Sequence, residues 1–324
     1  MATTVEEQLA IYLTNAHAIE LQALVQVERA PSIAGDPELA DAFAKHLEET
    51  KRHERFVRSR LEALSWAPVT HKGLAARATG IGFALFARFQ PDTPGKLAAH
   101  AYSYEHMELA AYDLLGRLAK RAQDSETELM ADMIERDERT MASRLEACFD
   151  RAVAASLREI GVEDLGKQLD KYLTDAHAIE QQAIQLLKKG SKLAGTKELA
   201  AAYEDHLVQT TEHSELLERR LRARGSSPSA LKDAALRLGA LNWGMFFQAQ
   251  VDTPAKLAGF SYAFEHLEIA AYELLKRVAA RAADEETIST AAKILLEERE
   301  AAGRIHSLFD YALDASLQEA GITA

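Results

Sequence analysis

The sequence predicts an all-α protein that contains two four-helix bundles in tandem. Two observations predict this fold. The chain repeats itself when it is shifted by 160 residues, and each half carries four long segments with apolar residues at three- and four-residue spacings. We find no segment with the strict polar–apolar alternation that is typical of a strand. Residues 1–160 and 161–324 are therefore expected to form two domains of the same fold.

The repeat extends through both halves. "NAHAIELQA" from Asn15 aligns with "DAHAIEQQA" from Asp175. Residues 92–115 align with residues 252–275, with 15 of 24 positions identical. Solenoid units are only about 20–50 residues long, so a period of this length indicates that a whole domain was duplicated.

The expected helices can be justified in order along the first half. Start signals precede two of them, because Asp36 and Thr93 are capping residues that come directly before a proline. The loops "RAPSIAGD" and "QDSE" are short, so the helices that they join should be antiparallel neighbours. The four expected helices cover residues 4–28, 37–64, 94–122 and 126–157.

The connection between the second and third helices is much longer than these loops. It covers about 30 residues, which is enough to cross a bundle from end to end. Two helix pairs joined by one long crossover form a ferritin-like bundle rather than a simple up-and-down bundle. The apolar stretch "GIGFALFARF" from Gly80 predicts a short helix within this crossover, packed on the end of the bundle or at a dimer interface.

The composition excludes several classes of function. A net charge of −12 disfavours binding to nucleic acid and to anionic membrane surfaces, because both depend on lysine and arginine. The longest apolar stretch is far shorter than the roughly 20 residues of a membrane span. Cys148 is the single cysteine, which rules out an intramolecular disulfide and a cysteine-rich metal site. These features lead us to expect a cytoplasmic protein.

Carboxylates interrupt the apolar faces of the expected helices. In the third helix Glu108 completes the apolar series that runs from Tyr104 to Ala111, and Glu105 lies on the edge of the same face. In the first helix Glu20 lies within the apolar stripe. Burying an unpaired carboxylate costs several kcal/mol, so a proton, an arginine or a cation must compensate each of them.

The second and fourth helices carry similar residues. "HLEETKRH" places His46, Glu49 and His53 on one face of the second helix, and Glu135 and Glu138 lie among apolar residues of the fourth. Four helices that each present a carboxylate, together with an inward histidine, predict a dinuclear carboxylate centre in the core of a bundle. Oxygen ligands combined with imidazole suit iron or manganese.

Simpler explanations exist for the individual residues. Any one of these glutamates, taken alone, is more simply a solvated surface residue. His46 is more simply a satisfied or half-exposed histidine, and His17 and His106 are outer partners of a ligand or surface residues. Tyr102 and Tyr112 are typical core aromatics, one of which could donate a hydrogen bond to a ligand carboxylate.

These motifs resemble the YciE/YciF-type ferritin-like family of small bacterial stress-associated proteins. The resemblance covers both halves and depends on "AHAIE" (residues 16–20), "HLEETKRH" (46–53), "EHMELAAYDLL" (105–115) and "RDERTMA" (136–142). It implies four-helix bundles that form dimers and hold a dimetal carboxylate centre. The implied metal ligands are Glu20, Glu49, His53, Glu105 or Glu108, and Glu138, with the counterparts Glu180, His213, Glu265 or Glu268, and Glu298.

The sequence departs from the usual ferritin-like pattern, in which a histidine follows a glutamate by three residues on two helices. Glu49 and His53 are four residues apart, and Met141 stands where the second histidine would be expected. In the second half Gln209 replaces Glu49. The first half is therefore expected to hold metal more tightly, and the second half to hold one ion or none.

Two functions of different classes follow from this pattern. The first is a non-haem di-iron oxidase or ferroxidase that uses O₂ or peroxide in a stress response. The alternative is a non-catalytic scaffold with a vestigial or structural metal site, especially in the second half. The halves are expected to pack as an intramolecular pseudo-dimer, and the chain could also form a homo-oligomer.

Overall fold

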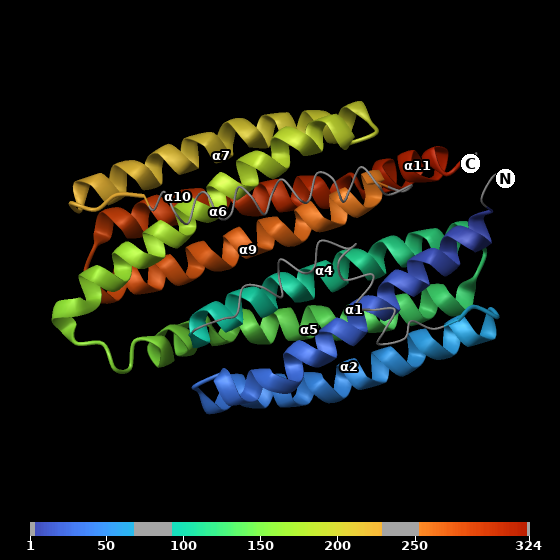
Figure 1. The fold of residues 1–324 in the computed structure, drawn as a ribbon, viewed down its shortest axis with the longest axis horizontal. Coiled ribbons are helices and arrows are strands. Elements are labelled where there is room, and N and C mark those ends of the chain that lie inside the picture. The colour runs from blue at the N-terminus through green and yellow to red at the C-terminus, as the bar shows by residue number, and fades with distance from the viewer. Residues whose placement is uncertain (1–3, 68–92, 229–252, 323–324) are drawn as a thin grey trace.

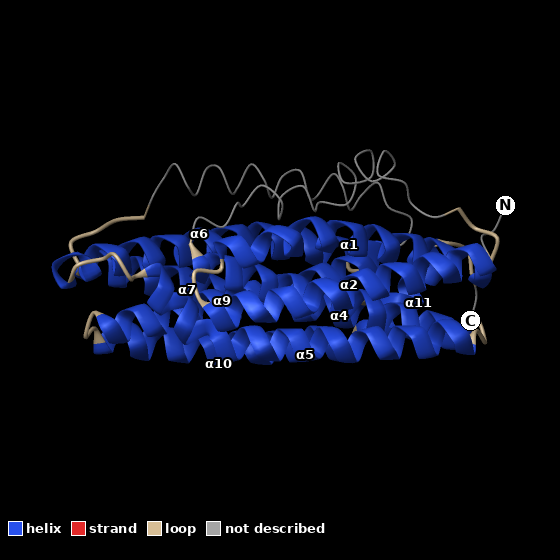
Figure 2. Ribbon diagram, turned by 90° about the horizontal axis from the view of Figure 1, so that it is seen from below, coloured by secondary structure: helices blue, strands red, loops and turns tan. Residues whose placement is uncertain are grey.

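A computed structural model of the chain describes residues 4–67, 93–228 and 253–322. Within these ranges the regular elements are helices and no strand occurs, which confirms the predicted all-α class (Figure 2). The first half contains α1 (Val5–Ile33), α2 (Pro37–Ala63), α4 (Pro94–Arg121) and α5 (Ser125–Ser156). The second half contains α6 (Leu165–Leu193), α7 (Lys197–Ala223), α9 (Thr253–Arg281), α10 (Glu285–Ser307) and α11 (Phe309–Glu319), and the 3₁₀ helix η2 (Val162–Asp164) lies between the halves.

The helix starts follow the capping signals in the sequence. The Asp36 carboxylate accepts hydrogen bonds from the backbone N–H groups of Glu38 and Leu39 at 3.0 and 3.1 Å. The Thr93 hydroxyl accepts one from the N–H of Lys96 at 3.3 Å. These side chains satisfy N–H groups that have no partner inside the helix, which explains why α2 and α4 begin where predicted.

Two helix ends differ from the prediction. Helix α1 continues past the predicted end at residue 28 and includes Pro31 in its last turn. A proline removes one helical hydrogen bond, and here it does so where the helix is about to end, while the extension buries Ala30 in the core. In the second half the fourth helix is divided at Leu308 into α10 and α11, whereas α5 is continuous.

Contacts at the two ends of the first half establish its topology. Gly35, between α1 and α2, has φ +65°, and a Cβ atom there would lie 2.8 Å from Cγ of Pro94 at the start of α4. At the other end, Arg60 in the last turn of α2 forms an ion pair with Asp124 after α4 at 2.6 Å. Helix α2 thus ends at the end of the bundle opposite to the start of α4 (Figure 1). The crossover and its predicted short helix lie outside the described residues.

The two halves pack against each other through α4 and α9, which lie side by side in the middle of the molecule (Figure 1). The Ser103 hydroxyl donates a hydrogen bond to the backbone carbonyl of Ala263 at 2.7 Å. The rings of His106 and His266 stack with their centroids 3.5 Å apart. These two histidines occupy equivalent positions in the repeat, so equivalent surfaces face each other across an approximate twofold axis.

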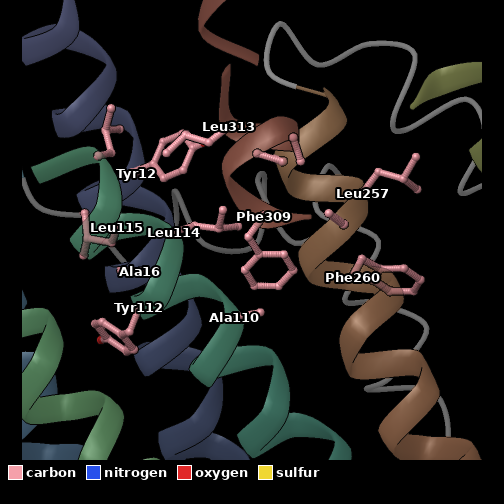
Figure 3. Close-up of a cluster of buried hydrophobic side chains, with 14 of the residues drawn as sticks. Tyr12, Ala16, Ala110, Tyr112, Leu114, Leu115, Leu257, Phe260, Phe309 and Leu313 are labelled. Carbon is pink, nitrogen blue, oxygen red and sulfur yellow. The ribbon is translucent and has the colours of Figure 1, made fainter. Parts of the chain in front are cut away.

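A continuous apolar core joins the halves. Figure 3 shows part of it, where Tyr12 of α1 and Leu114 of α4 belong to the same cluster as Phe260 of α9 and Phe309 of α11. Because α4 and α9 face both their own bundle and the opposite half, most of their side chains are buried. Carboxylates on these two helices therefore lie deep in the molecule. Among the described helices, none combines the length and apolar character needed to cross a membrane.

Candidate metal centre

Six ionisable side chains meet in the interior of the first half. None of them is more than 2% exposed, and all four helices of the bundle contribute. The two histidines are seven residues apart on α2, which is two helical turns, so both face the interior. The six residues are Glu20 of α1, His46 and His53 of α2, Glu105 and Glu108 of α4, and Glu138 of α5.

Glu138 lies at the centre of this group. Its Oε2 atom is 3.5 Å from Nε2 of His46, and its Oε1 atom is 2.8 Å from Nδ1 of His53. Nε2 of His46 is also 3.2 Å from Oε2 of Glu105. Nδ1 of His53 is 3.9 Å from Oε1 of Glu20. The two oxygens of Glu138 thus face two neighbouring positions, one beside each histidine.

The second half repeats this geometry. Nε2 of His206 is 2.8 Å from Glu265 and 3.4 Å from Glu298. Nδ1 of His213 is 2.8 Å from Glu298 and 3.8 Å from Glu180. Each of these distances agrees with its counterpart in the first half to within 0.4 Å. Glu268 occupies the place of Glu108, and all six side chains are again buried.

Burial and mutual repulsion dominate the electrostatics of the first cluster. Burial, reinforced by the charge of Glu138, raises the pKa of Glu20 to about 8. The same two causes raise the pKa of Glu108 well above its usual value. Burial lowers the pKa of His53, but its contact with the Glu138 carboxylate outweighs this and raises it to about 9. Without a cation, the cluster therefore holds several protons near neutral pH.

Glu108 is the carboxylate of this cluster whose charge has the fewest compensating partners. Among the described residues, neither of its side-chain oxygens has a hydrogen-bond partner, and no lysine, arginine or histidine lies within 4.0 Å. Glu268 is in the same situation in the second half. The other carboxylates around Glu108 repel its charge and do not explain why a carboxylate occupies this position, whereas a cation would.

We predict that Glu108→Leu makes the metal-free protein more stable. An unsatisfied buried polar group costs about 1–3 kcal/mol, and leucine of similar size removes this cost. The free energy of unfolding, measured by denaturant titration in the presence of a chelator, should rise by about that amount. Glu108→Gln keeps a polar group and should give a much smaller gain. A loss of stability with leucine would show that the carboxylate is satisfied without metal.

Tyr112 fixes the orientation of Glu20. Its hydroxyl donates a hydrogen bond to Oε1 of Glu20, and Tyr272 does the same for Glu180 in the second half. One of the two tyrosines considered in the sequence is thus a partner of a cluster carboxylate. Tyr102 instead lies at the interface, where its ring contacts His106.

Glu49, which the sequence suggested as a ligand, is not among the residues that the structure brings together in the cluster. Its carboxylate is partly exposed, accepts from Nδ1 of His46 at 3.2 Å, and lies 3.1 Å from Arg144 of α5. It is three residues after His46, about 60° around the helix, and this offset directs it toward the arginine. Gln209 contacts His206 in the same way at 3.1 Å, so its presence removes no cluster carboxylate from the second half.

His46 belongs to the cluster, although its simpler interpretation from the sequence was a satisfied or half-exposed histidine. It is 1% exposed and contacts two cluster carboxylates, so it supplies the second histidine that Met141 does not. The signal was present in the repeat, because both halves carry a histidine seven residues before His53 or His213. Of the other residues considered, Glu135 pairs with Arg139 outside the cluster, and His17 is buried against Glu54.

Asp137 is a further residue that the sequence did not single out. Its carboxylate accepts from Nε2 of His53 at 3.1 Å, on the side of the ring away from the cluster. Glu297 has the same role for His213 at 2.6 Å. In both halves the sequence places an acidic residue directly before the buried glutamate of the fourth helix. This repeated pattern could have identified Asp137 and Glu297.

The comparison with known protein families agrees with the duplication. A family model described as "Domain of unknown function (DUF892)" matches residues 4–158 and matches again over residues 164–318. No solved structure gives a match to the chain. The two matches cover most of the chain and coincide with the two helical halves. The chain therefore belongs to the DUF892 family and contains its domain twice in tandem.

Proposed function

We propose that each half, residues 1–160 and 161–324, is a ferritin-like domain that holds a pair of divalent metal ions. The observation that carries this proposal is the composition of the buried cluster. Four carboxylates and two imidazoles converge in each half, with no lysine or arginine among their ion-pair partners in the described residues. Two divalent cations would balance four carboxylate charges.

The two ions of the first half would occupy two adjoining positions. We define the His46 position by His46, Glu105, Glu108 and Glu138, and the His53 position by Glu20, His53 and Glu138. Glu138 belongs to both, so it would bridge the ions. The corresponding His206 and His213 positions share Glu298. A donor set of carboxylate oxygens with one imidazole per ion suits iron, with manganese as the alternative.

We further propose that the centre acts as a non-haem oxidase or ferroxidase in a cytoplasmic stress response, as the resemblance to the YciE/YciF-type family implies. A bound pair of ferrous ions would supply two electrons, which with two protons reduce O₂ to hydrogen peroxide. The role of the chain would be to hold both ions in a water-poor core. Glu20 and Glu108, whose pKa values burial raises in the metal-free protein, would release their protons when the ions bind.

An anaerobic loading experiment tests this proposal. The apoprotein is loaded with Fe(II), air is admitted, and the near-ultraviolet charge-transfer absorption and the O₂ consumption are recorded. We expect about four bound iron ions per chain, one for each of the four ligand groups, and oxidation much faster than in free solution. Bound iron that oxidises no faster than free iron would refute the oxidase role, and a protein that binds no iron would refute the metal centre as well.

The alternative is a scaffold in which the ions are structural. The complete burial of the six side chains favours this possibility too, because structural metal sites are enclosed. Elemental analysis and O₂ consumption distinguish the two. Metal that stays bound through purification and shows no reaction with O₂ or peroxide would favour the scaffold.

A further inference from the structure

Each histidine of the two clusters contacts a side-chain acceptor with its second ring nitrogen. In the first half the acceptors are Glu49 for His46, at 3.2 Å, and Asp137 for His53, at 3.1 Å. In the second half Glu297 accepts from His213 at 2.6 Å. His206 differs, because its acceptor is the amide oxygen of Gln209, at 3.1 Å. We call the ring nitrogen that faces the cluster the inner nitrogen, and the other nitrogen and its acceptor the outer nitrogen and the outer acceptor. Three of the four outer acceptors are thus carboxylates, and one is a neutral amide.

The amide preserves the position of the ring but not the charge behind it. The contact distances of Glu49 and Gln209 differ by only 0.1 Å, so both acceptors hold the outer nitrogen of their histidine in the same place. Arg144, which pairs with Glu49, has Arg304 as its counterpart, and Arg304 pairs with Asp205 instead. The second half therefore lacks the outer charge and also the ion pair that accompanies it in the first half.

This difference acts on the inner nitrogen of the ring. An acceptor on the outer N–H fixes the tautomer in which the inner nitrogen offers its lone pair to a metal ion. A carboxylate acceptor also makes the imidazole a stronger base and hence a stronger ligand, whereas an amide does so to a smaller extent. Loss of such an outer partner typically weakens metal binding about 10–100-fold.

We propose that Gln209 is a positioning residue that makes the His206 position the weakest of the four metal positions. The inference depends on the proposed metal centre and adds an order of affinity to it. At high metal concentration the second half then retains both ions. As the metal concentration falls, the His206 ion is released before the other three ions. The His206 ion is held about tenfold more weakly than the His46 ion, the lower end of the range, because an amide still accepts the hydrogen bond.

Titration of full-length variants with Mn(II), monitored by the EPR signal of the free ion, tests this order. Glu138→Ala disables the first half so that the second reports alone, and Glu298→Ala does the reverse. We expect the weaker ion of the second half to bind less tightly than either ion of the first half, and about tenfold less tightly than the His46 ion. In these backgrounds Gln209→Glu should remove the difference, and Glu49→Gln should weaken the first half to the same extent.

Two control variants test whether a change in affinity comes from the contact with the histidine or from any change of charge on α7 or α2. Thr211→Glu adds the same charge to an exposed position of α7, and Glu48→Gln removes a charge next to Glu49 on the exposed side of α2. Neither should change the Mn(II) isotherm by more than about twofold, because exposed charges are screened. Equal affinities in the two halves, or no response to Gln209→Glu, would overturn the inference and leave the metal centre intact. If wild type binds no Mn(II), both fail.

A second measurement covers the case in which a disabling variant does not fold. Wild type and Gln209→Glu are loaded with Co(II), and the hyperfine-shifted imidazole N–H resonances are recorded by NMR. The resonance of His206 should move when the amide acceptor becomes a carboxylate, while the other three histidines stay unchanged. A spectrum identical to that of wild type would contradict the role of Gln209.

Discussion

Replacing both Glu138 and Glu298 with alanine is expected to reduce the bound metal from about four ions per chain to nearly none. Each of these glutamates belongs to both ligand groups of its half. Its removal takes one carboxylate from both positions and leaves the two ions without their shared ligand. Glu138→Ala alone should leave about two ions, held by the second half. Native mass spectrometry of Mn(II)-loaded protein measures these numbers directly.

Asp132→Ala provides the matched control, because it removes one carboxylate from the exposed face of the same helix. It should leave all four ions bound. Circular dichroism on each variant shows whether the helices are retained. Full metal occupancy in the folded double variant would contradict the account, since no ion could then depend on the shared glutamates.

Without metal, the protein is expected to lose stability as the pH rises from about 4.5 to about 9. The pKa of Glu20 and of Glu180 is raised by burial from 4.5 to about 8. Contact with a glutamate outweighs burial and raises the pKa of His53 and of His213 from 6.5 to about 9. A raised pKa means that the folded state holds protons that the unfolded state has released. The stability contributed by these groups is present at low pH and is lost as the pH rises through these windows.

Metal should reverse this trend, because ions displace the same protons and bind more tightly as the pH rises. The difference in Tm between the Mn(II)-loaded and the chelated protein should therefore grow from about pH 6 to about pH 9, corresponding to several kcal/mol. Thermal unfolding followed by circular dichroism at several pH values measures both curves. A difference that stays constant with pH, or shrinks, would show that the ions do not replace protons in these clusters.

The sequence predicted the parts of the structure that depend on local pattern. The repeat, the caps at Asp36 and Thr93, and the helical periodicity are local, and they placed most helix boundaries within two residues. The inward direction of Glu20, Glu108 and Glu138 followed from the same periodicity, because each carboxylate interrupts an apolar stripe. These three residues lie in the buried cluster of the first half.

The remaining features depend on contacts between helices. Periodicity places His46, Glu49 and His53 on one face, but it cannot resolve which side chain is inside when the difference is about 60°. That choice depends on Arg144, which lies on another helix and pairs with Glu49. Asp137 contacts His53 from α5 for a similar reason. Such pairings become visible only when the helices are packed together.

The central claim is that a pair of metal ions occupies each buried cluster. Anomalous scattering from crystals of the Mn(II)- or Fe(II)-loaded protein tests it most directly. We predict two peaks in each half, about 3.5–4 Å apart, on either side of Glu138 and Glu298. Crystals with anomalous peaks only at surface carboxylates, and none beside these two glutamates, would contradict the claim.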